Sequence, residues 1–277
     1  MIFKLHWMTI SMPGPNKLPI TAIVASYNEG HLLERCLSAL FFCDEIIVIN
    51  LLSTDNTVEI ARKYATRILN YPHYPIVEQA LYYAIPEARH EWILLTDPDE
   101  ETSIKLANHI IKLFQNKEVY QYSAVRVPIQ FYFKSTPLKG TIWGGYFNNC
   151  RYMFRKGHFS VYNEVHGGTR INDSKKILNV YRSEYSLVNH HYWMTSWHQL
   201  FEKHHRYNSK EAQKLFNTGE TFSLKKQLLT TIKAFRSSYI ITRGYKDGII
   251  GLLLSIFWAY YNFMNWHELK KLQNQPK

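Results

Sequence analysis

The sequence is poor in cysteine, and its few cysteines form no recognisable pattern. Cys36, Cys43 and Cys150 are the only three among 277 residues. Their number is odd, and their spacing fits no metal-ligand motif. A disulfide-stapled scaffold is therefore excluded, and we predict free thiols in a reducing compartment.

The N-terminal segment lacks a convincing secretion signal. Lys4, His6 and Lys17 interrupt the apolar residues of segment 1–19, and no small-residue cleavage site follows. We expect a cytoplasmic protein in which residues 1–18 form a flexible extension. Internal repeats and low-complexity segments are also absent, so a repeat architecture is not expected.

Acidic residues become scarce after residue 100. The formal net charge is +11, of which residues 1–100 contribute −5 and residues 101–277 contribute +16. A uniformly basic nucleic-acid binder would not carry an acidic first part, so we expect no nucleic-acid partner. The basic part instead indicates an anionic partner such as a membrane surface. Because 46% of the residues are hydrophobic, the chain can bury a sizeable core.

Three short apolar runs read as buried strands. They are Ile20–Ser26, Glu45–Asn50 and Glu91–Thr96, and segments with helical spacing separate them. The helix that follows the second strand is expected to bury Val58, Ala61, Ala65 and Ile68. This alternation predicts an α/β fold with a mainly parallel sheet flanked by helices.

Each predicted strand runs into polar residues at its carboxyl end. Tyr27–Glu29 follow the first strand, Asn50–Asp55 end and follow the second, and Asp97–Glu100 follow the third. Ligands of such sheets bind beyond the carboxyl ends of the strands. The three clusters therefore predict one ligand site at this edge.

Asp97 and Asp99 are the strongest candidates for metal ligands. We expect an extended backbone here, which would place both carboxylates on one face. Two adjacent carboxylates repel each other, and a divalent cation removes that conflict. Oxygen ligands suit Mg²⁺ or Mn²⁺, which can also bind diphosphate oxygens. The pair therefore predicts a metal-assisted reaction with a nucleoside-diphosphate leaving group.

These segments together resemble the family 2 glycosyltransferases of the GT-A fold. The resemblance rests on ITAIVASYNE, EIIVINLLSTDNTVEIA and EWILLTDPDE, which match in order and spacing over residues 19–101. It implies an inverting hexosyltransferase that uses a nucleotide sugar and Mg²⁺ or Mn²⁺. Motifs in the second half, among them Arg243–Gly251 (RGYKDGIIG), resemble the bacterial lipopolysaccharide inner-core β-1,4-glucosyltransferases.

The resemblance also assigns roles to individual residues. It places Tyr27 near the nucleotide base, Asn50 at the nucleoside position and His166 near the metal or diphosphate. The expected contacts to the nucleotide sugar are Ser26, Tyr27, Asn28, Glu29, Asn50, Ser53, Asp55 and Asp97, and the expected metal ligands are Asp97, Asp99 and His166. The family usually has Asp where this chain has Asn50, which leaves the identity of the donor open.

An inverting transfer needs a base that takes the proton of the acceptor hydroxyl. The candidates are Glu100, Glu101, Glu164 and Asp173. We place Glu164 first, because it lies beside His166, and Glu100 second. The residue after His166 is Gly167 rather than the Glu that the family pattern contains, so the choice of base remains open.

The C-terminal region is first basic and then apolar. Basic residues precede the uncharged run Gly248–Trp266, which contains Asn262 and several interfacial aromatics. This composition favours a helix lying in the membrane interface over one that spans the bilayer. Packing on the catalytic domain is the alternative, and one helix can do both. We expect a GT-A domain over residues 19–215 and a helical region over residues 216–277.

The predicted function is transfer of a sugar, with UDP-glucose as the first choice of donor, to a lipopolysaccharide-core or other cell-surface glycan. The expected place is the inner face of a bacterial cytoplasmic membrane. Two alternatives stay open at this stage. One is a polyprenyl-phosphate or protein glycosyltransferase. The other is a non-catalytic basic protein that binds lipid or nucleic acid; the acidic first hundred residues argue against nucleic acid.

Overall fold

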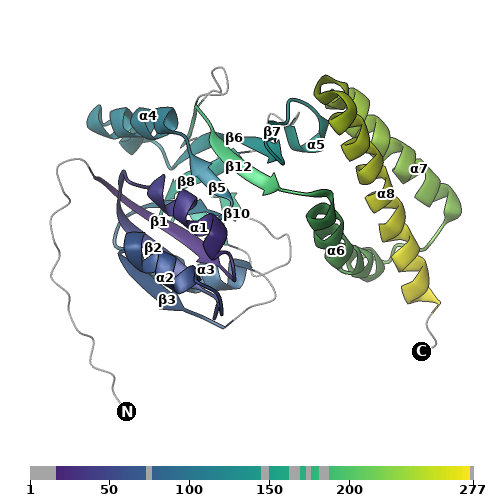
Figure 1. Cartoon of the computed structure of the whole chain (residues 1–277), viewed down its shortest axis with the longest axis horizontal. Helices are drawn as coiled ribbons and strands as arrows, with labels where there is room; N and C mark the ends of the chain where they lie inside the picture. The colour runs from purple at the N-terminus through teal and green to yellow at the C-terminus, as the bar shows by residue number, and fades with distance from the viewer. Residues whose placement is uncertain are drawn as a thin grey trace, which may run out of the picture. The chain divides into compact units, whose positions relative to one another are not determined.

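The computed structural model describes residues 17–72, 77–144, 150–161, 169–172, 176–180 and 187–274. The chain forms two compact units (Figure 1). Unit 1 comprises residues 1–127 and 151–188, and unit 2 comprises residues 128–150 and 189–277. Helix α6 of unit 2 runs through residue 215, and the domain boundary predicted there stays a prediction.

Unit 1 contains most of the sheet. Its strands are β1 (Leu18–Ser26), β2 (Cys43–Asn50), β3 (Arg67–Asn70), β4 (Trp92–Thr96), β5 (Glu100–Thr102), β8 (Cys150–Arg155), β9 (Phe159–Val161), β10 (Thr169–Ile171), β11 (Ile177–Asn179) and the first residues of β6 (Ala124–Phe133). The order β3-β2-β1-β4 is parallel throughout, and β8 joins β4 in antiparallel fashion. The predicted parallel α/β core is therefore confirmed.

Helices of unit 1 cover both faces of this sheet. They are α1 (Gly30–Ser38), α2 (Thr57–Tyr64), α3 (Val77–Glu87), α4 (Ile104–Gln115) and the short η1 (Glu118–Gln121). Alternate strand residues point to opposite faces. Ala22 and Val48 pack in the same core as α1, α2 and α4, whereas Ile23 and Ile47 pack with α3.

The expected helix after β2 is shorter than its periodicity suggested. α2 ends at Tyr64, and Ala65 has an extended backbone. Ile68 was wrongly assigned to the helix: it lies in β3, where it pairs with Val48. Its apolar side chain continues the helical spacing by coincidence, and the gain from sheet pairing decides its conformation.

Unit 2 is mainly helical and also contains short strand segments. It contains the rest of β6, β7 (Thr136–Pro137), α5 (Thr141–Gly144), β12 (Asn189–Met194), α6 (Trp197–Asn217), α7 (Leu224–Arg236), η3 (Ser237–Ile241), η4 (Gly244–Asp247) and α8 (Gly248–Gln273). β12 runs parallel to β6, and α8 packs against both α6 and α7. The apolar core includes Phe133, Trp193, Leu200 and Leu254.

The segment Arg243–Gly251 packs backbone against backbone. A Cβ atom on Gly251 would lie 1.9 Å from the carbonyl oxygen of Gly244, and one on Gly140 would lie 2.1 Å from that of Arg243. Asp247 accepts hydrogen bonds from the backbone N–H groups of Lys139 and Gly140 at 2.7 and 2.8 Å. This motif therefore fixes the start of α8 to the loop before α5.

The C-terminal helix has one packed face and one open face. Among the described residues, Gly244–Gln273 is the one helical stretch whose length and composition would allow it to cross a membrane. In its most apolar 18 residues, 22% are buried. Leu254 and Phe257 pack inside unit 2. On the other face Ile249, Leu253, Ile256 and Tyr260 are exposed, at the i, i+4, i+7 spacing of a single helical stripe.

Candidate active site

The carboxyl ends of three parallel strands meet in register. Ser26 of β1 lies opposite Asn50 of β2, and Asn50 lies opposite Asn70 of β3. On the other side of β1, Val24 lies opposite Thr96, the last residue of β4. The predicted polar clusters therefore come together at one edge of unit 1. Asn70 was missed in the sequence because β3 was read as part of a helix.

Asn50 organises the loop after its own strand. Its Oδ1 accepts a hydrogen bond from the Ser53 N–H at 3.0 Å, and its Nδ2 donates to Asn70 Oδ1 at 2.8 Å. The side chain is almost fully buried. Both ends of the amide are thus held by the protein, which fixes the loop between Leu51 and Asn56.

Asn28 joins this loop to the one after β1. Its backbone has φ 54°, a left-handed conformation that Asn tolerates well. Its N–H donates to Ser53 Oγ at 3.0 Å, and its Oδ1 accepts from the Thr54 N–H at 2.7 Å. The two loops are therefore linked by reciprocal hydrogen bonds rather than by apolar packing.

Asp55 links the starts of α1 and α2. Its carboxylate accepts hydrogen bonds from Gly30 N–H at 3.0 Å, Thr57 N–H at 3.0 Å and Thr57 Oγ1 at 2.5 Å. Burial by itself would raise the pKa of Asp55, but these hydrogen bonds outweigh it and hold the pKa below its usual value. Glu29 N–H donates to Thr57 Oγ1, so Glu29 adds to the same connection. These contacts give Asp55 a positioning role at the helix ends.

Two residues of the first loop have contrasting surroundings. The ring of Tyr27 is 42% exposed and can reach a ligand at the sheet edge. Ser26 Oγ is buried and has no hydrogen-bond partner among the described residues. Tyr27 is therefore the more accessible of the two side chains, and its contact with a nucleotide base stays a prediction.

Asp97 and Asp99 lie on a tight turn between β4 and β5, and the extended backbone expected here was wrong. The turn is closed by a 3.0 Å hydrogen bond from Glu100 N–H to the Asp97 carbonyl. Cys36 of α1 also donates its thiol to that carbonyl, at 3.3 Å. Both aspartates are half-buried and Pro98 between them is buried. The turn is thus held against α1, the helix that follows Tyr27–Glu29.

Of the base candidates, Glu100 is the best defined. It is fully buried, and its Oε2 accepts a 3.0 Å hydrogen bond from Thr96 Oγ1. Glu101 lies 3.9 Å from Arg35. Glu164, Asp173 and His166 lie outside the residues that the structure describes. The described part therefore supplies a structural role for Glu100, while the assignments of Glu100 and Glu164 as bases stay predictions.

The donor set at the turn fits a hard divalent cation. Asp97 and Asp99 offer carboxylate oxygens, which suit Mg²⁺ or Mn²⁺ that takes its other ligands from water and diphosphate. Within the described ranges, no group of three or more His, Cys, Asp or Glu side chains surrounds a common point. His166, the third predicted ligand, lies outside the described residues, so the assignment of Asp97, Asp99 and His166 to a metal site stays a prediction.

Comparison with known families decides the class of the protein. The profile described as "Glycosyl transferase family 2" matches residues 21–171, more than half of the chain. The chain belongs to glycosyl transferase family 2. The match runs from within β1 to the end of β10 and includes the predicted donor-site and metal residues, whereas the base candidate Asp173 lies just beyond it.

Related proteins extend the similarity beyond this region. The chain is 26% identical over 265 residues to an uncharacterized glycosyltransferase of Rickettsia bellii, covering 92% of this chain and 87% of that protein. It is 23% identical over 255 residues to the lipopolysaccharide core biosynthesis glycosyltransferase LpsC of Rhizobium meliloti, covering 90% of each. Both alignments include the helical C-terminal region.

A solved structure shows the same fold. The mannosyltransferase PcManGT from Pyrobaculum calidifontis, in complex with GDP-Man and Mn²⁺, matches with a TM-score of 0.50 and 14% identity. The match covers 96% of this chain and 90% of that chain. The predicted GT-A fold, a mainly parallel sheet flanked by helices and followed by a helical extension, is confirmed.

Proposed function

We propose that this family 2 glycosyltransferase is an inverting hexosyltransferase that acts on a lipopolysaccharide-core or other cell-surface glycan, with UDP-glucose as the first candidate donor. The acceptor class is supported by the similarity to LpsC over 90% of the chain. The donor site is supported by one observation above all. Two hydrogen-bonded loops, held by Asn28 and Asn50, lie at the sheet edge where the Asp97–Asp99 turn ends β4.

The residues at this edge would contact different parts of the nucleotide sugar. Tyr27 and Asn50 would contact the nucleoside, and Asp97 and Asp99 would hold the diphosphate through Mg²⁺ or Mn²⁺. When bound, the cation neutralises charge on the departing nucleoside diphosphate. The acceptor hydroxyl attacks the anomeric carbon as the bond from that carbon to the diphosphate oxygen breaks. A carboxylate takes the hydroxyl proton, and Glu164 is the first candidate for it.

The test combines donor binding with transfer. Wild type, Asp97→Asn and Asp99→Asn are compared in a thermal-shift screen of UDP-glucose, UDP-galactose and GDP-mannose with and without Mn²⁺. One donor should raise the Tm of wild type only when Mn²⁺ is present. Either substitution should remove this shift and lower transfer by at least ~100-fold.

Glu59→Gln is the matched control, since Glu59 is an exposed carboxylate on α2 that pairs only weakly with Lys63. It should keep both the shift and the activity. Undiminished transfer in both aspartate variants would overturn the proposed donor site. The acceptor is tested by feeding the enzyme and a membrane extract a donor with a labelled sugar. Recovery of the label in polyprenyl phosphate or protein rather than in a glycan would favour a different acceptor.

The second part of the proposal is peripheral binding to the inner face of a bacterial cytoplasmic membrane. Between Thr221 and Lys246 the chain has six Lys or Arg residues and no acidic residue. Leu228, Leu229 and Ile232 of α7 are exposed beside these cations. Exposed apolar side chains flanked by cations match the chemistry of an anionic lipid interface.

A further inference from the structure

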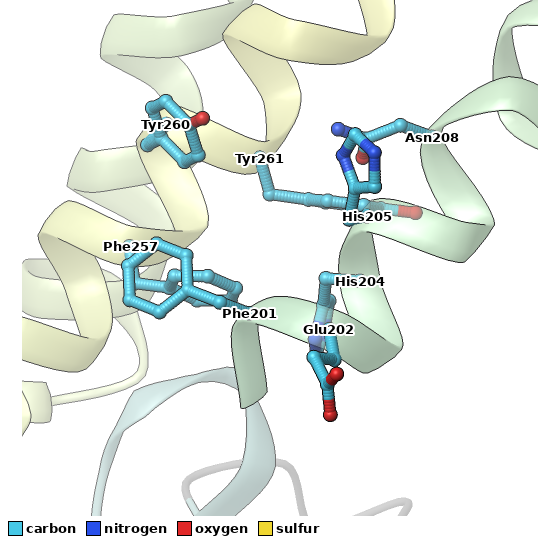
Figure 2. A pocket seen from close by; sticks show the side chains of 8 residues that line it. All are labelled: Phe201, Glu202, His204, His205, Asn208, Phe257, Tyr260 and Tyr261. Atoms are coloured by element: carbon cyan, nitrogen blue, oxygen red, sulfur yellow. The ribbon is translucent and has the colours of Figure 1, made fainter. Parts of the chain in front are cut away.

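Unit 2 contains a pocket between α6 and α8 (Figure 2). Its volume is about 270 Å³, just below the roughly 300–1,000 Å³ range of small-molecule sites. Phe201, His204 and Asn208 line it from α6, at the i, i+3, i+7 spacing of one helix face, and Glu202 and His205 of the same helix also line it. Phe257, Tyr260 and Tyr261 line it from α8. None of these side chains has a role in the donor site.

The apolar part of the pocket is made of aromatic faces. Phe201 is 46% exposed and Tyr260 is 48% exposed, although both belong to helices that pack in the core of unit 2. Their ring centroids lie 6.1 Å apart, and Phe257 lies 4.9 Å from Phe201 in an edge-on arrangement. Rings fixed in this way present electron-rich faces that attract the C–H groups of a sugar ring.

The polar part includes an amide that the protein leaves unsatisfied. Asn208 is only 5% exposed, and its Oδ1 has no hydrogen-bond partner among the described residues. Figure 2 shows its side chain extending from α6 on the side that faces α8. Buried acceptors without partners are rare in native proteins, and each needs a partner such as an ordered water or a bound ligand.

His204 supplies a second acceptor. Its Nδ1 lies 2.8 Å from the Leu200 carbonyl, which can only accept, so Nδ1 carries the proton. Burial lowers the pKa of His204, with Lys203 adding to the effect and the Leu200 hydrogen bond opposing it. The ring is therefore neutral at pH 7, and Nε2 keeps a lone pair for a hydroxyl donor.

We propose that this pocket is a saccharide subsite that binds one neutral ring of the acceptor glycan. The ring stacks on the aromatic faces, and its hydroxyls donate to Asn208 Oδ1, which a rotation of the amide brings to the pocket surface. An acyl chain would leave that oxygen unpaired in a still drier site, which disfavours a purely apolar ligand. That this sugar belongs to the acceptor rests on the proposed function. The preference of the pocket for a sugar rests on the side chains of the pocket alone.

The position of Tyr260 suits a glycolipid acceptor. The same residue ends the exposed apolar stripe that begins at Ile249 on α8. A sugar held in the pocket would therefore lie next to exposed apolar side chains of α8, which also suit contact with lipid. This arrangement matches a glycan whose anchored end remains in the membrane.

The experiment uses the full chain and a lipid-free probe, the core oligosaccharide released from lipopolysaccharide by mild acid. Isothermal titration calorimetry without donor measures its binding to wild type, Asn208→Leu, Tyr260→Ala and Tyr260→Phe. Asn208→Leu and Tyr260→Ala should each weaken binding roughly 10-fold, because each removes one contact. Tyr260→Phe keeps the ring face and should bind nearly as well as wild type.

Gln213→Leu is the matched control for the amide. Gln213 is exposed on α6 outside the pocket and bonds only to Asn217, so its loss should leave oligosaccharide binding unchanged. The Tm adds a second criterion. Asn208→Leu removes a buried acceptor that has no partner, so it should not lower the Tm even though it weakens binding.

Several outcomes would overturn the subsite: no saturable binding to wild type, equal binding by all variants, or displacement of the oligosaccharide by lauric acid. The last would assign the pocket to an acyl chain. The UDP-glucose thermal shift with Mn²⁺ reports separately on the donor site. If that shift is absent while the pocket variants still weaken oligosaccharide binding, the proposed function fails and the sugar-binding site stands.

Discussion

Asn50 and Asn70 lie opposite each other on the neighbouring parallel strands β2 and β3, and Asn50 Nδ2 donates a 2.8 Å hydrogen bond to Asn70 Oδ1. The pair gives a structural reason for an amide at a position where the resembling family usually has Asp. A carboxylate at position 50 could not donate this bond. The amide of Asn70 could rotate and donate instead, because its O and N ends are nearly equal in shape.

This pair leads to a prediction for two substitutions. Asn50→Asp should leave the free energy of unfolding within about 1 kcal/mol of wild type, because Ser53 N–H keeps its acceptor and Asn70 can turn. Asn50→Leu should lower it by about 1–3 kcal/mol, since both partners lose their hydrogen bonds. Urea denaturation measures the difference, and equal losses in both variants would contradict the assignment of these bonds.

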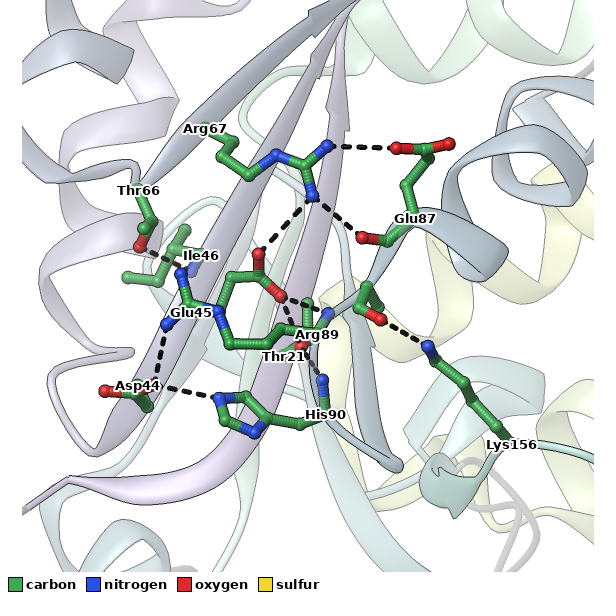
Figure 3. A network of polar contacts seen from close by, with 11 residues as sticks. Thr21, Asp44, Glu45, Ile46, Thr66, Arg67, Glu87, Arg89, His90 and Lys156 are labelled. Atoms are coloured by element: carbon green, nitrogen blue, oxygen red, sulfur yellow. Dashed lines mark hydrogen bonds and ion pairs between the residues drawn. The ribbon is translucent and has the colours of Figure 1, made fainter. Parts of the chain in front are cut away.

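Glu45 is a buried carboxylate at the opposite edge of the sheet, where β2 begins (Figure 3). Its Oε2 accepts 2.7 Å hydrogen bonds from Thr21 Oγ1 and from Arg89 N–H. Its Oε1 lies 3.6 Å from Arg67 Nη1, which is an ion-pair distance too long for a hydrogen bond. The carboxylate thereby links β1, β2 and β3 to the segment before β4.

Replacing Glu45 should therefore destabilise unit 1. Glu45→Ala leaves the buried Thr21 hydroxyl and the Arg89 N–H without their acceptor, and we expect a loss of about 3–5 kcal/mol. Glu45→Gln keeps one acceptor oxygen and should lose less, about 1–3 kcal/mol. Chemical denaturation of both variants gives the order. Glu87→Gln is the control, because Glu87 also pairs with Arg67 but is exposed.

His204 should make stability depend on pH. Burial lowers its pKa in the folded protein, whereas an unfolded histidine titrates near 6.5. Below that pH the unfolded chain binds a proton at His204 more readily than the folded chain does, so the free energy of unfolding falls as the pH drops. Above it both states are neutral, and this contribution is constant. The Tm at pH 5.5 should be lower than at pH 7.5.

The variant that isolates this effect is His204→Phe, which keeps an aromatic ring against Phe257 and Tyr261. It should reduce the fall in Tm between pH 7.5 and 5.5. His198→Gln is the control, since the His198 side chain is 84% exposed and should leave the fall unchanged. An unaltered pH profile in His204→Phe would show that other groups govern acid sensitivity.

Binding to anionic lipid should depend on α7. Lys225 and Lys233 are exposed, and each can contribute about 1 kcal/mol near an anionic surface. The double variant Lys225→Gln/Lys233→Gln should therefore bind phosphatidylglycerol vesicles roughly 30-fold more weakly in a sedimentation assay. Lys105→Gln/Lys112→Gln removes two exposed cations from α4 and is the matched control. Equal losses in both would indicate a nonspecific charge effect.

Much of the secondary structure of unit 1 could be predicted from the sequence. The apolar runs ending at Ser26, Asn50 and Thr96 are strands at those positions, because a buried parallel strand needs a continuous apolar sequence. Two local readings failed. Ile68 continues a helical spacing yet pairs in a sheet, and the Asp97–Asp99 segment turns where extension was expected. For Ile68, pairing with a distant strand outweighed the local pattern, whereas the Asp97–Asp99 turn is closed by a local hydrogen bond from Glu100 N–H to the Asp97 carbonyl.

The sequence by itself determined the family, the parallel core and the candidate loops, because periodicity and short motifs act within a few residues of the chain. Only the tertiary structure decided which partners each side chain has. It brought Asn70 to Asn50, Asp55 to Gly30 and Asn208 to the aromatic residues of α8. Such contacts join residues 20 or more positions apart, and no local pattern specifies them, since they follow from how strands and helices pack.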